Sequence, residues 1–193
     1  GRLDVSLPTA VTAPGQTITL FADQVASTET ISSGTFADFP NSSLPEQTFV
    51  VAVAGTYDLA VQLSALSPSA SNTLGIVHYQ AIVDEGDYNG FPEQTLGSQA
   101  EAEKEWQIVV TSSGSPVVEY KTVYASLELA AGTHKIKFQA KEDTGSDGSP
   151  RVSTSAIFKA TGFLRSGSGA GGTLVSETSL SADVTVRTGS DNI

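Results

Sequence analysis

The residues that could carry out acid–base or metal chemistry are two histidines and two groups of carboxylates. His78 and His134 are the only histidines, and the chain contains no cysteine. Without cysteine, thiolate catalysis, disulfides and Cys-ligated zinc or iron–sulfur sites are excluded. The carboxylates lie in two segments that also contain glycine, one with Asp84, Glu85 and Asp87 and the other with Glu142, Asp143 and Asp147.

Carboxylate oxygens in a loop are suitable calcium ligands, which makes Asp84 and Asp87 candidate metal ligands. Neither acidic segment has the spacing of an EF-hand or a repeat-type calcium loop, so the preferred interpretation is two solvated loops. A glycosidase acid–base pair could be drawn from the same carboxylates, but nothing in the sequence sets their separation. We therefore expect no cofactor, with calcium as the alternative.

No catalytic motif accompanies these residues. The chain has no Gly-x-Ser-x-Gly elbow, and its GSGAGG stretch lacks the Gly-Lys-Ser/Thr ending of a phosphate-binding loop. His134 alternates with Ile136 and Phe138, which is typical of a structural histidine on a buried strand face. We predict that the protein is not an enzyme.

One group of aromatic residues could bind a ligand. Tyr88, Phe91 and Trp106 fall in a loop-rich region, where exposed rings could stack on sugars. The alternative is that Trp106, the only tryptophan, begins a strand and packs inward. Asn41 begins an N-x-Ser/Thr sequon, which matters only if the protein enters a glycosylating compartment.

Composition limits the classes of partner. Lys and Arg total 10 against 21 Asp and Glu, a net charge of −11 that argues against nucleic-acid binding. Only 16% of residues are charged, and a Ser/Thr/Gly-rich surface of this kind favours a virion-surface, extracellular or secreted β-protein. The longest apolar run is 49–54, so we expect no membrane insertion. Because Met is absent, we expect Gly1 not to be the translated start.

Apolar and polar residues alternate along most of the chain, which predicts strands rather than helices. The predicted strands are 17–22, 49–53, 57–63, 75–84, 106–111, 117–129, 134–141, 152–162 and 173–187. One short helix is expected within 98–105, where Ser98 and Glu101 have the spacing of a capping box. The predicted fold is all-β: an antiparallel jelly-roll β-sandwich with extended N- and C-terminal arms and at most one short helix.

The domain organisation follows from where the alternation weakens. We expect an arm at 1–16, a sandwich at 17–165, a Gly/Ser tether at 166–172 and a terminal strand or arm at 173–193. Leu174, Leu180, Val184 and Val186 are candidate assembly residues in that last segment. Its strand could pair with the sheet of its own subunit or with that of a neighbour, and both alternatives stay open.

One stretch occurs twice: AGTYDLAVQL at 54–63 returns as AGTHKIKFQA at 131–140. The apolar positions match and the polar ones do not, so we interpret the repeat as two strand entries of one sandwich. Each glycine is expected to supply a turn with positive φ. The second copy carries Lys135, Lys137 and, just beyond it, Lys141, which could meet an acidic neighbour during assembly.

The segments VAVAGTYDLAVQLSA and LELAAGTHKIKFQAK resemble strands of two groups of β-sandwich domains. One group contains the jelly-roll heads related to tumour necrosis factor and the complement globular heads, together with phage fibre and decoration proteins of that kind. The other contains the calcium-containing carbohydrate-binding modules of glycoside hydrolases. The first resemblance implies assembly of identical copies, with three-fold symmetry.

Two functions are consistent with these observations. The first is a non-enzymatic structural protein of a virion surface, either a decoration or a fibre-head component, which contacts copies of itself and other virion or surface proteins. The alternative is a carbohydrate-binding module or an adhesin or pilus subunit that binds glycans. The expected location is the virion surface or the extracellular space.

Overall fold

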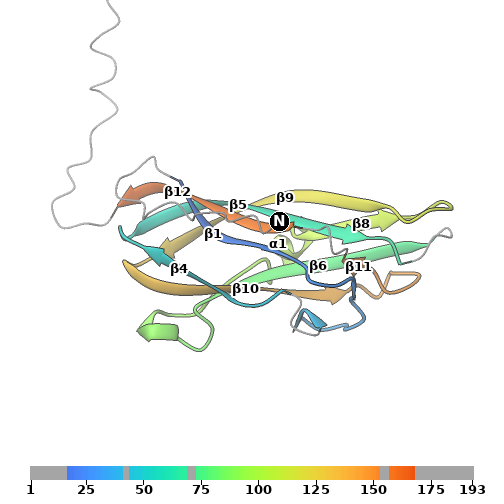
Figure 1. Ribbon diagram of the computed structural model, residues 1–193, viewed down its shortest axis with the longest axis horizontal. Helices are drawn as coiled ribbons and strands as arrows, with labels where there is room; N and C mark the ends of the chain where they lie inside the picture. Colours follow the sequence, from blue (N-terminus) through green and yellow to red (C-terminus); the bar gives the residue numbers. More distant parts are fainter. Residues whose placement is uncertain (1–16, 41–43, 69–72, 153–156, 168–193) are drawn as a thin grey trace, which may run out of the picture.

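The computed structural model describes residues 17–40, 44–68, 73–152 and 157–167. In this part of the chain, two antiparallel sheets pack face to face, and one six-residue α-helix lies in a connection between strands (Figure 1). The predicted all-β jelly-roll sandwich is confirmed. No described helix has the length and apolarity needed to cross a membrane.

The first sheet is built around strand β5, Gly55–Leu66. On one edge of β5 lies β12 (Ile157–Gly167), followed outward by β1 (Thr17–Gln24). The short strand β11 (Arg151–Val152) pairs with the last residue of β5 on the same edge as β12, and β2 (Glu29–Thr30) pairs with β11. The opposite edge of β5 pairs along its whole length with β9 (Val118–Leu129).

The second sheet is built around β10, Gly132–Glu142. One edge of β10 pairs with β4 (Gln47–Val51) and β3 (Ala37–Asp38), and the other pairs with β6 (Leu74–Val83). The far edge of β6 pairs with β8 (Gln107–Thr111) and β7 (Gln94–Leu96). The 3-10 turn η2 (Tyr88–Gly90) and helix α1 (Ala100–Glu105) lie in the connections.

The repeated AGT segments begin β5 and β10, the central strands of the two sheets. Their matched apolar positions all point into the core: Tyr57, Leu59, Val61 and Leu63 in one, and His134, Ile136, Phe138 and Ala140 in the other. The architectural interpretation of the repeat is therefore confirmed. The expected positive φ is found at Gly132 (152°) but not at Gly55, where the strand begins in extended conformation.

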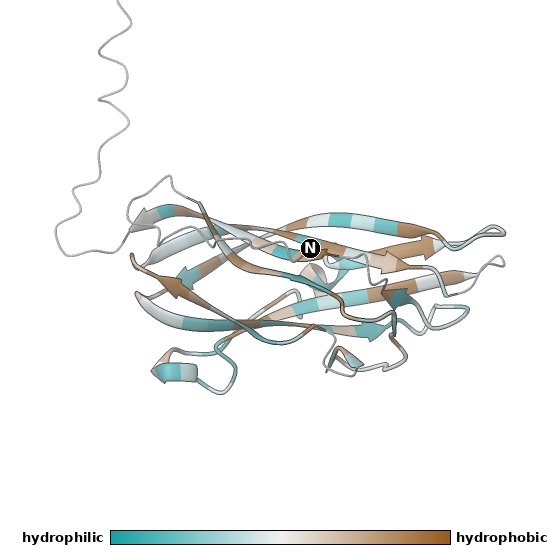
Figure 2. Ribbon diagram, in the orientation of Figure 1, coloured by the Kyte–Doolittle hydropathy of each residue, from teal (hydrophilic) through white to brown (hydrophobic). Residues whose placement is uncertain are grey.

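Aromatic rings fill the centre of the sandwich. Phe158 of β12 makes edge contacts with Phe39 and Tyr79, with ring centroids 5.3 and 5.6 Å apart, and Phe21 meets Phe138 at 4.7 Å. Phe21, Tyr79, Phe138 and Phe158 come from strands, and Phe39 directly follows β3. Hydrophobic and hydrophilic residues are interspersed along the strands (Figure 2). Rings from both sheets interlock in this way, which holds the two layers together.

Three details differ from the sequence-based expectations. The helix begins at Ala100 with Gln99 as its N-cap and no side-chain cap, so the capping box at Ser98 is wrong. The predicted tether begins too early, because Ser166 and Gly167 belong to β12. The predicted strand 152–162 corresponds to the end of β11 and most of β12. The arm 1–16, the sequon at Asn41 and the segment 173–193 lie outside the described residues.

Candidate functional site

Most of the residues predicted to bind ligand or metal lie in one loop, 84–93, which connects β6 to β7 and rests on the start of β10. Three of its non-glycine residues have positive φ: Asp84 at 55°, Asp87 at 57° and Asn89 at 54°. Each such residue costs about 1 kcal/mol or more, and a cluster persists only where surrounding contacts hold it in place.

Side chains of the loop supply those contacts. The Oδ1 atom of Asp87 accepts a hydrogen bond from the amide of Glu93 at 3.1 Å, and the Oε2 atom of Glu93 accepts one from Gly86 at 2.9 Å. Asn89 donates from Nδ2 to the carbonyl of Thr133 on β10 at 3.1 Å. The loop is therefore closed on itself and fastened to the second sheet.

A buried ion pair lies beneath the loop. His134 on β10 contacts Asp84 through Nδ1 and Oδ2 at 2.6 Å, with the two side chains 1% and 0% exposed. The second ring nitrogen of His134 lies 2.9 Å from the carbonyl of Ala130. The Oδ1 atom of Asp84 accepts a hydrogen bond from the backbone amide of Lys135. Both ring nitrogens of His134 and both carboxyl oxygens of Asp84 therefore have hydrogen-bonding partners within the protein.

Two phenylalanine rings stack on the imidazole. The ring centroid of Phe49 lies 5.4 Å from that of His134 and the centroid of Phe91 lies 4.3 Å from it, and both rings are nearly parallel to the imidazole. Phe91 also covers Gly132, where an added Cβ would stand 2.6 Å from the ring. Beside this stack is an open groove of about 280 Å³, lined by Ala54, Gly55, Phe91, Pro92, Leu129 and Ala130 among others. We call it the Gly55 groove.

The predicted pairing of Asp84 and Asp87 in a calcium site is not what the structure contains. Asp84 points inward to His134, and Asp87 accepts a bond from the backbone of its own loop. Within the described ranges, no three His, Asp or Glu side chains are grouped closely enough to hold a metal ion. Asp84 is buried, whereas Asp87 is exposed, so the two carboxylates do not face a common site.

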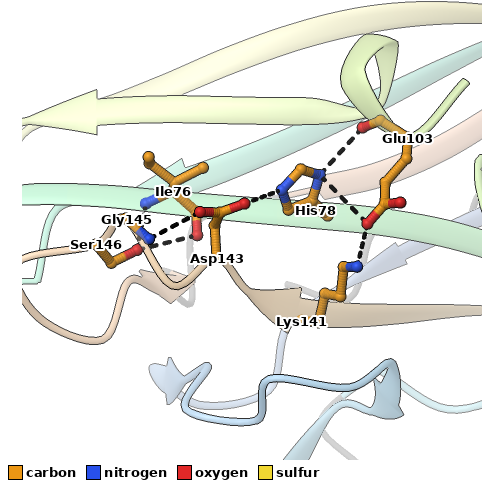
Figure 3. A network of polar contacts seen from close by, with 7 residues as sticks. All are labelled: Ile76, His78, Glu103, Lys141, Asp143, Gly145 and Ser146. Atoms are coloured by element: carbon orange, nitrogen blue, oxygen red, sulfur yellow. Dashed lines mark hydrogen bonds and ion pairs between the residues drawn. The ribbon is translucent and has the colours of Figure 1, made fainter. Parts of the chain in front are cut away.

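One residue of the second acidic segment, Asp143, contacts His78 on β6 (Figure 3). The Nε2 atom of His78 lies 2.8 Å from Oδ2 of Asp143, and its Nδ1 atom lies 3.1 Å from the carbonyl of Glu103 in helix α1. Lys141 of β10 forms an ion pair with the carboxylate of Glu103. One imidazole thus joins a strand, the helix and the loop after β10.

The carboxylate of Asp143 stabilises its own loop as well. The amide of Gly145 donates to its Oδ1 atom at 2.8 Å, and this bond, followed by that of His78, lowers the pKa of Asp143 below its ordinary value. The hydroxyl oxygen of Ser146 in the same loop accepts a hydrogen bond from the backbone amide of Ile76 at 2.9 Å. These carboxyl and hydroxyl groups hold the loop to β6, so the segment is a structural connection.

The aromatic platform predicted from Tyr88, Phe91 and Trp106 is wrong. Trp106 is 1% exposed and packs inward, where Gly97 leaves room for its ring. Its carbonyl accepts the amide of Tyr79, which continues the pairing of β8 with β6. Tyr88 lies elsewhere, with the Lys135 ammonium 4.5 Å from the centre of its ring.

The three lysines do lie on the outer face of β10, but acidic side chains of the same chain already contact them. Lys135 pairs with Glu46 at 2.7 Å, and Lys137 pairs with Asp38 at 3.0 Å and Glu85 at 2.6 Å. Lys141 pairs with Glu103. The three lysines proposed to meet an acidic neighbour therefore already form ion pairs within the chain. The other assembly candidates, Leu174, Leu180, Val184 and Val186, lie outside the described residues.

Sequence reasoning missed an apolar surface on the outer face of the first sheet. Tyr120 and Tyr124 of β9 and Ile157 and Phe163 of β12 are between 42% and 73% exposed. We call this surface the tyrosine face. The signal was present in the alternation, because both tyrosines occupy the polar phase opposite the buried Val123 and Leu127.

Charges on the tyrosine face balance. Its four long strands carry two acidic and two basic outward residues, which are Asp58, Glu128, Lys159 and Arg165. Arg165 donates from Nε to Asp58 at 2.8 Å, and this pairing lowers the pKa of the Asp58 carboxyl. The remainder of the molecule therefore carries the whole net charge of −11.

Comparisons with known proteins find similarity to solved structures but not to family models or curated sequences. No protein-family model matches the chain, and no curated protein matches its sequence. Among solved structures, the chain is similar to the globular domain of zebrafish complement 1qA protein, at 15% sequence identity. The similarity covers 80% of this chain and 99% of that domain, with a TM-score of 0.33.

Proposed function

We propose that the protein is a non-enzymatic structural protein whose copies assemble through the tyrosine face. The observation that carries this proposal is the exposure of Tyr120, Tyr124, Ile157 and Phe163 together on one sheet surface. Large apolar side chains gathered on one face are typical of protein–protein contacts. Burying one such side chain contributes about 1.5–3 kcal/mol.

The partner we propose is a second copy of the same chain. Tyr124 of β9 is opposite Ala60 of β5, which is opposite Thr161 of β12. A large side chain therefore stands beside two small ones in one row across the sheet. One surface that carries both a projection and a hollow can be complementary to itself. Copies with a charge of −11 repel each other, and a face with balanced charge avoids that cost at the contact.

We further propose that the assembly belongs to a virion surface, as a decoration or fibre-head component, or to another extracellular surface. A Ser/Thr/Gly-rich chain with 16% charged residues supports this assignment. Three copies around an axis is the arrangement that the resemblance to complement-type heads implies. The alternative of a carbohydrate-binding module has lost its main support, because Trp106 is buried.

Light scattering after size exclusion tests the proposal across a range of protein concentrations. The unaltered chain is expected to be an oligomer, and Tyr124→Lys is expected to weaken its association at least about tenfold. The matched control is Val109→Lys, which places the same charge at a 51% exposed apolar residue of the second sheet. A monomer at all concentrations, or equal effects of both variants, would reject the tyrosine face as the interface.

A further inference from the structure

We infer that Asn89 is a deamidation site that the folded loop shields, and that its conversion to a carboxylate releases the 84–93 loop from β10. The chain contains four asparagines, and only Asn89 is followed by a glycine. Because glycine has no Cβ, its amide nitrogen is the least hindered of any that can follow an asparagine. Asn89 is also exposed, so water reaches it. The inference is independent of the tyrosine face, since the loop belongs to the other sheet.

The reaction joins groups of two adjacent residues. The amide nitrogen of Gly90 attacks the side-chain carbonyl carbon of Asn89 and forms a C–N bond to it. The side-chain nitrogen of Asn89 leaves as ammonia and takes the Gly90 amide proton with it. Water then opens the cyclic imide at either of its carbonyls, which gives aspartate or isoaspartate. The net change consumes water and releases ammonia, and it needs no oxidant, reductant or cofactor.

In the folded loop, both reacting groups are held apart. The Gly90 amide, which supplies the attacking nitrogen, donates to the carbonyl of Asp87 at 2.9 Å. The side-chain nitrogen of Asn89 donates to the carbonyl of Thr133 on β10 at 3.1 Å. The backbone of Asn89 has φ 54° and ψ 22°, and at this ψ the Gly90 nitrogen points away from the Asn89 side chain. The imide therefore cannot close until the backbone at Asn89 rotates.

Deamidation accordingly requires the loop to open. Its fastenings are the hydrogen bonds of Asp87 and Glu93 within the loop, the Asn89 contact with β10, and the packing of Phe91 over Gly132. A surface loop opens at a smaller cost in free energy than the sandwich unfolds. The rate of modification is thus set by how often the 84–93 loop leaves β10.

The product cannot restore the closed loop. An ionised carboxylate has no hydrogen to donate, so at position 89 it would face the carbonyl of Thr133 acceptor to acceptor. Its charge would join the exposed carboxylates of Asp87 and Glu93 in the same short loop, and like charges at such separations repel. Release of the loop withdraws Phe91, which forms part of the wall of the Gly55 groove.

Peptide mapping by mass spectrometry tests the shielding. The full chain and a synthetic peptide of residues 84–93 are incubated in the same mildly alkaline buffer. In each, the segment that contains Asn89 is followed for the mass difference between an amide and a carboxyl. Deamidation of Asn89 is expected to be at least about tenfold slower in the folded chain than in the peptide.

Amide hydrogen exchange tests the release. The variant Asn89→Asp reproduces the aspartate product, and its Gly90 and Phe91 amides, which are hydrogen-bonded in the closed loop, are expected to exchange at least about tenfold faster than in the unaltered chain. The matched control Thr95→Asp adds the same charge at an exposed residue of β7 and retains the Asn89 contact. Its loop amides are expected to exchange as in the unaltered chain.

Three results would overturn the inference. The first is deamidation of Asn89 at equal rates in the folded chain and in the peptide, which would show that the fold does not shield it. The second is a peptide in which Asn89 stays unmodified. The third is unchanged exchange of the loop amides in Asn89→Asp, or equal acceleration in Thr95→Asp, with β10 amides still protected as evidence that the sandwich is folded.

Discussion

Asp84 and His134, fifty residues apart in the chain, meet at 2.6 Å in a fully buried pair. The pair fastens the 84–93 loop to the centre of the second sheet, because Asp84 begins the loop and His134 lies near the start of β10. The strained backbone of the loop is thus held by a contact that solvent does not weaken.

Replacing Asp84 with Asn is expected to destabilise the fold by about 3 kcal/mol. The side-chain amide can still accept a hydrogen bond from the backbone amide of Lys135, but the buried contact with His134 loses its carboxylate. Denaturant unfolding measures the loss. Asp87→Asn is the control, since Asp87 is exposed and also has positive φ, and it is expected to change stability by less than about 0.5 kcal/mol. Equal losses would contradict the role of the pair.

Gly132→Ala is expected to cost about 1–3 kcal/mol, because the new methyl group would overlap the ring of Phe91 that stacks on His134. In a Phe91→Ala background the same change should cost less, since the overlapping ring is gone. A double-mutant cycle measures this difference. Gly34→Ala is the control, because an added Cβ there meets nothing within 4 Å. Strict additivity would show that the ring and the glycine do not interact.

Acid stability is expected to depend on Asp143. Its folded pKa is lowered by the Gly145 amide and by His78, so its contribution is present above the unfolded value of about 3.9. The contribution is lost as pH falls through the folded pKa. Thermal melting of the unaltered chain and of Asp143→Asn should therefore differ at neutral pH and converge in acid. A difference that stays constant with pH would contradict this assignment.

Alkaline titration is expected to leave Tyr79 un-ionised until the protein unfolds. Burial raises the pKa of Tyr79 above its ordinary value, and its hydroxyl donates to the carbonyl of Ser64 at 2.6 Å. The stability that this confers is present below the unfolded pKa of about 10 and is lost as pH rises. Tyr79→Phe should remove the last step in phenolate absorbance and cost about 1 kcal/mol at neutral pH. Loss of an early step instead would place Tyr79 at the surface.

The alternation of apolar and polar residues was sufficient to predict which side chains of a strand are buried. The alternation in 57–63 and 134–140 predicted the buried residues of β5 and β10, including His134, because successive side chains of a strand point to opposite sides. The same rule identified β6, β8 and β9 within a residue or two of their observed ends. The all-β class followed from these repeated local patterns.

The ligand, metal and assembly candidates could not be placed in this way, because each depends on contacts between distant segments. Lys137 is neutralised by Asp38, which is 99 residues away, and Asp84 contacts His134, which is 50 residues away. Trp106 is buried because β8 continues from it along β6.

By itself, the sequence determined the strands, their inward faces and the absence of thiol chemistry, since these depend only on residue type and on neighbours along the chain. Only the tertiary structure decided which polar groups meet and which face of each sheet stays uncovered. Tyr124 illustrates the distinction: alternation places it opposite Val123, but only the packing of the second sheet against the Val123 side leaves Tyr124 73% exposed.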